Sequence, residues 1–113
     1  MIRTSVALGF LAAMLWALVA AAVAEAHDAT PTPKMPMGWK YPFSCCADYD
    51  CRDVPADWIA EKAGGYQIVI TGEVVGYTDK RVKQSPDGRF HWCSKAGSLV
   101  GETICLFVPP SGS

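Results

Sequence analysis

The clearest pattern of apolar and polar positions lies in the last third of the chain. Residues Arg89–Ser94 alternate, so the two aromatic residues share one face of a strand, while His91 and Cys93 share the other. The run Thr103–Val108 is apolar at nearly every position, which is typical of a strand buried on both faces. The sequence therefore predicts two strands here, with Thr103–Val108 as the central one.

Two further β-rich runs, Tyr66–Ile70 and Val74–Tyr77, are separated by a Thr-Gly-Glu segment, which predicts a hairpin. Before them, residues Val54–Ala63 have the start and stop signals of a short helix, with Asp53 near its N-cap and Gly64 at its end. Together these patterns predict an α+β, β-rich fold with about four mostly antiparallel strands and one short helix.

The first 26 residues have the pattern of an export signal. Arg3 supplies a positive start, an apolar run covers Val6–Ala24, and small residues follow at two cleavage sites. An uncleaved membrane anchor is the alternative, because the run approaches the roughly 20 residues that span a bilayer. Cleavage leaves no membrane span in the remaining chain, and we therefore expect a periplasmic or secreted protein.

Composition divides the rest into a proline-rich arm (27–42), a cysteine-rich β domain (43–110) and a tail (111–113). Fewer than a hundred residues bury only a small core, so covalent cross-links are expected in an exported chain. The net charge of −1 gives no electrostatic reason to bind nucleic acid.

Five cysteines supply these cross-links: Cys45, Cys46, Cys51, Cys93 and Cys105. Adjacent cysteines rarely bond each other, because the ring that they would close is strained. We expect one of the adjacent pair to bond Cys93 or Cys105, and the other to close onto Cys51 or the remaining strand cysteine. The odd cysteine stays open between a buried thiol, an intermolecular bridge, a metal ligand and a catalytic thiol.

The amino terminus suggests metal chemistry. Either cleavage site places His27 at or near a new terminal amine, and an amine beside an imidazole chelates Cu(II) or Ni(II). Met35 and Met37 add thioethers that suit Cu(I), and His91 is a further candidate ligand. No cofactor is expected for the leading hypothesis given below, and copper belongs to the metal-handling alternative.

No catalytic motif is recognisable, so the leading hypothesis is an exported, non-enzymatic module that binds an unknown protein or envelope component. Aromatic and arginine side chains tend to dominate contacts at interfaces. The candidate binding surface is therefore Trp39, Tyr41, Lys80, Arg81 and Lys83. The alternatives are a periplasmic copper or other metal-handling protein and a thiol redox protein that uses the odd cysteine.

Five short motifs follow one another along the chain. They are Trp39-Lys40-Tyr41-Pro42, Cys45-Cys46 with Cys51, Gly64-Gly65-Tyr66, the run from Ser85 to Cys93, and Cys105-Leu106-Phe107-Val108-Pro109-Pro110. In this order they resemble a family of short, exported, cysteine-rich bacterial proteins of uncharacterised function. The resemblance implies a periplasmic or secreted domain with all five cysteines in its pattern, and no catalytic residue. The proline-bearing arm between His27 and Trp39 is longer here than in that family.

Overall fold

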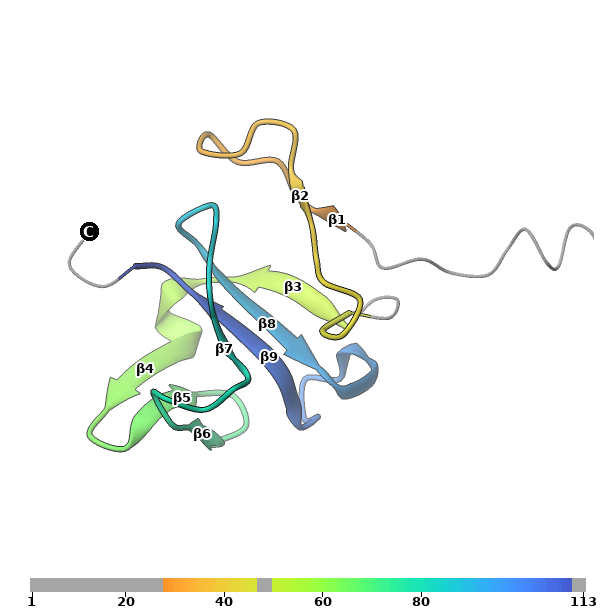
Figure 1. Cartoon of the computed structure of the whole chain (residues 1–113). Coiled ribbons are helices and arrows are strands. Elements are labelled where there is room, and N and C mark those ends of the chain that lie inside the picture. Colours follow the sequence, from red (N-terminus) through yellow and green to blue (C-terminus); the bar gives the residue numbers. More distant parts are fainter. Residues whose placement is uncertain (1–27, 47–49, 111–113) are drawn as a thin grey trace, which may run out of the picture.

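Nine strands in three sheets are present in the described residues, 28–46 and 50–110, of the computed structural model (Figure 1). The strands are β1 (Asp28–Ala29), β2 (Trp39–Lys40), β3 (Cys51–Val54), β4 (Ile59–Lys62), β5 (Gly65–Ile68), β6 (Val74–Val75), β7 (Val82–Gln84), β8 (Phe90–Ser94) and β9 (Thr103–Val108). Two short 3-10 turns, η1 (Ala56–Trp58) and η2 (Lys95–Gly97), complete the described structure.

The central sheet has the strand order β3-β8-β9-β7 and separates two apolar clusters. β8 pairs antiparallel with β3 and β9, whereas β7 pairs parallel with β9. The predicted central strand, Thr103–Val108, has these bounds and lies between two neighbours. It is apolar on both faces because Phe107 packs in one cluster and Leu106 in the other.

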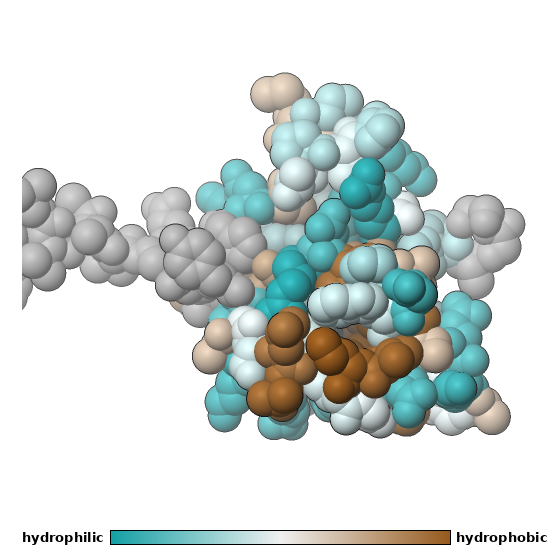
Figure 2. Space-filling model, turned by 180° about the vertical axis from the view of Figure 1, so that it is seen from behind, coloured by the Kyte–Doolittle hydropathy of each residue, from teal (hydrophilic) through white to brown (hydrophobic). Residues whose placement is uncertain are grey.

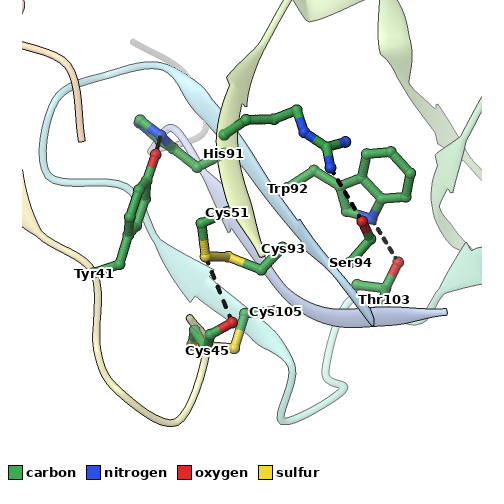
Figure 3. The surroundings of a disulfide bond; sticks show 10 residues. Tyr41, Cys45, Cys51, His91, Trp92, Cys93, Ser94, Thr103 and Cys105 are labelled. Atoms are coloured by element: carbon green, nitrogen blue, oxygen red, sulfur yellow. Dashed lines mark hydrogen bonds between the residues drawn. A yellow bond between two sulfur atoms is a disulfide. The ribbon is translucent and has the colours of Figure 1, made fainter. Parts of the chain in front are cut away.

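The alternation predicted for the strand before it is also confirmed. Trp92 packs with Leu106 in one cluster, and Cys93 belongs to the other. Figure 3 shows Trp92 on one side of β8, with His91 and Cys93 on the opposite side. The indole N–H of Trp92 donates to Thr103 Oγ1 (2.9 Å), so its one polar atom has a partner in the core.

The three-stranded sheet, β4-β5-β6, covers the face of the central sheet on which Trp92 lies. Its predicted hairpin is confirmed, since Tyr66 lies opposite Val75 and Gln67 opposite Val74. β5 ends earlier than predicted, because the amide groups of Thr71 and Gly72 donate to the Ile68 carbonyl and close a turn.

The predicted helix over Val54–Ala63 is wrong. Only the single 3-10 turn η1 forms there, and the following residues make strand β4, which pairs antiparallel with β5. This register places Ile59 opposite Ile68, and both side chains are buried beside Trp92. A short helix gains little by itself, so the burial available in the hairpin outweighs the local helix signals.

The arm packs onto the opposite face of the central sheet instead of leaving it open. β1 pairs with β2, and Ala29 is buried beside the cysteines. Gly38 permits this close approach: it has φ +71°, and a Cβ there would lie 2.5 Å from the Ala29 carbonyl oxygen. The Trp39 ring then lies edge-on to Phe107, with 5.1 Å between centroids.

The predicted export signal (1–26) and tail (111–113) lie outside the described residues. Within residues 28–46 and 50–110, none of the helical segments is long and apolar enough to cross a membrane.

Candidate functional site

A buried chain of hydrogen bonds joins the arm to the central sheet. The Tyr41 hydroxyl lies 2.7 Å from His91 Nδ1, and His91 Nε2 lies 2.8 and 2.9 Å from the two oxygens of Asp87. Their exposed fractions are 2% for Tyr41, 0% for His91 and 5% for Asp87. Tyrosine, histidine and aspartate follow one another here as they do in proton relays, but both ring nitrogens of His91 face protein groups.

Asp87 is the centre of this chain. Besides His91, its carboxylate accepts hydrogen bonds from the indole of Trp39, the hydroxyl of Ser85 and the amide of Arg89. Burial alone would raise the pKa of Asp87, but these hydrogen bonds, led by that of His91, lower the pKa to about 2. Asp87 is therefore an ionised acceptor near neutral pH, which makes His91 Nε2 the donor.

This assignment bears on the remaining hydrogen bond, between His91 and Tyr41. In the tautomer whose one ring proton is on Nε2, His91 accepts a hydrogen bond from the Tyr41 hydroxyl at Nδ1. Burial raises the pKa of Tyr41, and the nearby Asp53, Asp87 and Cys46 raise it further, so the phenol keeps its proton. We interpret the hydrogen bonds among Tyr41, His91 and Asp87 as a structural lock, which holds the arm on the central sheet, because the atoms that could react are enclosed in protein.

The prediction that Tyr41 belongs to an exposed binding surface is therefore wrong. Trp39 is half-buried, and its ring lies edge-on to Tyr41 and His91 as well as Phe107. Asp87 was missed as a site residue because it lies in a Ser-Pro-Asp-Gly turn, where aspartate is common. Its position four residues before a strand histidine was the available signal.

Two disulfides staple the same face of the sheet (Figure 3). Cys45 bonds Cys105, which confirms that one of the adjacent cysteines reaches a strand. The prediction that the other adjacent cysteine also forms a bridge is wrong, because Cys51 faces Cys93 in the β3–β8 register and bonds it. Two bridges in so small a domain indicate an oxidising, extracellular-type compartment.

Cys46 is the cysteine that belongs to neither bridge. Its side chain is 0% exposed and packs in the cluster with both disulfides. A thiol that reacts with external substrates needs access to them. The burial of Cys46 therefore favours the buried-thiol reading over a redox-active one.

The predicted metal ligands do not converge. Both nitrogens of His91 face Tyr41 and Asp87, and Met37 is 94% exposed, whereas Met35 is half-buried. His27 lies outside the described residues. Within residues 28–46 and 50–110, no group of three or more His, Cys, Asp or Glu side chains is placed to hold a metal ion. The copper hypothesis therefore rests on the sequence alone.

The three basic residues of the predicted binding surface differ in their surroundings. Lys83 lies in strand β7, and Arg81 makes ion pairs within the domain, with Glu73 (3.1 Å) and Asp79 (2.8 Å). Lys80 is exposed and Lys83 is half-buried, so these two remain candidates for contact with a partner.

A different surface stands out once the chain is folded. Five aliphatic side chains are exposed on two turns and at the start of β6: Val69 (53%) and Ile70 (44%), Leu99 (47%) and Val100 (85%), and Val74 (47%). Glu73, which directly precedes β6, is joined to the start of β9, since its carboxylate accepts hydrogen bonds from the amide and hydroxyl of Thr103. Figure 2 shows strongly hydrophobic side chains gathered on one face of the molecule. We call these five residues the two-turn patch.

Comparisons of the chain with protein-family models, with curated proteins and with solved structures found no match. The resemblance to short exported bacterial proteins accordingly stays a prediction.

Proposed function

We propose that this chain is an exported, non-enzymatic module that binds a protein or another component of the cell envelope through the two-turn patch. The exposure of its five aliphatic side chains carries the proposal. Contiguous exposed apolar patches typically mark interaction sites on soluble domains. Four of the five side chains lie on turns next to the strands of the two larger sheets, and loops that a rigid scaffold positions often carry function.

Export is supported by the signal-like pattern over residues 1–26 and by the two disulfides. Periplasmic retention and secretion both fit these observations. The enclosed Tyr41–His91–Asp87 chain supports a structural role for the groups most suited to catalysis.

The test is co-sedimentation of the purified chain with the envelope fraction of its own cells. The double variant Leu99→Ser, Val100→Ser should reduce the bound fraction at least about tenfold, because burial of one such side chain contributes about 1.5–3 kcal/mol. Met37→Ser is the matched control, since Met37 is exposed and apolar but lies on the arm. Equal retention of the double variant and the wild type would contradict the proposal.

A further inference from the structure

A groove of about 410 Å³ lies where the two larger sheets meet. The rings of Tyr66 and Tyr77 and the prolines that follow β9, Pro109 and Pro110, line it together with all three residues of β7. The volume is within the range of pockets that hold small ligands or single side chains. Successive side chains of a strand point to opposite faces, so a groove that touches three in a row also reaches the strand's backbone.

β7 is an edge strand of the central sheet, with β9 as its neighbour (Figure 1). The Leu106 amide donates to the Arg81 carbonyl, and the Ser85 amide donates to the Val108 carbonyl, both at 2.8 Å. Alternate residues of a parallel strand bond to opposite sides, so the backbone groups of Val82 and Gln84 face away from β9. The Val82 amide donates to Asp79, which closes a turn.

Three backbone groups of this outer edge have no hydrogen-bond partner within residues 28–46 and 50–110: the Val82 carbonyl and the amide and carbonyl of Gln84. The neighbouring polar side chains are also available in this part of the chain. Lys83 makes no ion pair with a described residue, and the Tyr66 hydroxyl makes no hydrogen bond with one. The groove therefore combines an open row of backbone groups with tyrosine, valine and proline side chains and with the Lys83 ammonium, which makes no ion pair with a described residue.

We propose that an extended peptide segment carrying an acidic side chain binds along β7 as an added strand. Its backbone pairs with Val82 and Gln84, and one apolar side chain enters the groove beside the rings of Tyr66 and Tyr77, which pack edge-on with 4.8 Å between their centroids. Strand addition to an exposed sheet edge is a common way to bind an extended peptide, with backbone bonds for affinity and pockets for specificity. The Lys83 ammonium supplies the preference for an acidic residue.

This site shares no residue with the two-turn patch, so it goes beyond the proposed function, and the two can fail separately. The probe is a phage-displayed library of random nine-residue peptides, selected on the whole purified protein, followed by synthesis of the enriched sequences. We expect them to carry Asp or Glu and to alternate apolar with polar positions.

Gln84→Pro is the deciding variant. Of the two outward-facing amides of β7, proline removes the one that has no partner among the described residues, leaves the bonds to β9 in place, and is tolerated on edge strands. It should weaken binding of the selected peptides about tenfold, which corresponds to one hydrogen bond at the upper end of its usual contribution. Gln84→Ala is the matched control, because it keeps the amide, and it should bind within about twofold of the wild type. Lys83→Glu should weaken acidic peptides about tenfold.

Amide hydrogen exchange on the wild-type chain gives a second readout that needs no variant. The Gln84 amide should exchange quickly in the free protein and slowly with peptide bound, whereas the Ser85 amide, bonded to β9, should be slow in both. The proposal is overturned if no peptide is enriched, which would make Lys83 a guard against edge pairing. It is equally overturned if Gln84→Pro binds the selected peptides as tightly as Gln84→Ala does.

Discussion

Replacement of Asp87 by asparagine is expected to lower the free energy of unfolding by about 3 kcal/mol. The buried carboxylate accepts four hydrogen bonds, from Trp39, Ser85, Arg89 and His91. Asparagine turns one acceptor oxygen into an NH₂ group that faces donors, and each buried donor left unpaired costs about 1–3 kcal/mol. Urea unfolding at pH 7, followed by tryptophan fluorescence, measures the loss. Asp57→Asn, at an exposed position, should change stability by less than about 0.5 kcal/mol.

The same variant should change the response to acid. The folded-state pKa of Asp87, about 2, is below the ordinary value of 3.8. Its ionised form therefore contributes stability that is fully present above about pH 4 and is lost as the pH falls from 4 towards 2. Asp79 contributes in the same window, because hydrogen bonds from Arg81 lower its pKa to about 2. Stability should fall less steeply in Asp87→Asn, and profiles of equal slope between pH 4 and 2 would contradict the lock.

Removal of the Cys45–Cys105 bridge by paired alanine substitutions should destabilise the chain by about 4 kcal/mol. The bridge joins residues separated by 60 positions, and the entropy that it removes from the unfolded chain grows with this length. Loss of a native disulfide from so small a domain often abolishes folding at 37 °C, so the variant should be largely unfolded at that temperature. Circular dichroism across a urea series measures the shift.

Cys46→Ala is the control for that experiment. It removes a buried thiol but leaves both bridges, and a small cavity costs about 1 kcal/mol. An equal loss of stability in Cys46→Ala and in the paired variant would mean that packing in the cysteine cluster, and not the cross-link, stabilises the arm.

The most accurate predictions concern the strands whose own residue pattern shows which of their faces are buried. Thr103–Val108 was predicted with its observed bounds, because a strand covered on both faces must be apolar throughout. In Phe90–Ser94, the alternation of residue types itself assigned each side chain to one face of the strand. The Tyr66–Val75 hairpin also followed from local signals, since its turn is short and its flanks are rich in β-branched residues.

The errors arose where contacts distant in sequence decide the outcome. Local signals at residues 54–63 favour a helix, and only the presence of Ile68 opposite Ile59 shows why a strand forms. Tyr41 and His91 are separated by 50 positions, so nothing near either residue reveals their hydrogen bond. An aromatic arm looks the same in sequence whether it binds a partner or its own sheet.

A peptide map tests whether this chain is an exported domain that two defined disulfides cross-link. The chain is purified from the envelope or culture fluid without reductant, alkylated before or after unfolding, and digested. We expect loss of the first 26 residues or a cut close to that point, peptides that link Cys45 to Cys105 and Cys51 to Cys93, and alkylation of Cys46 only after unfolding. A chain that still begins at Met1 with all five thiols open to alkylation would contradict it.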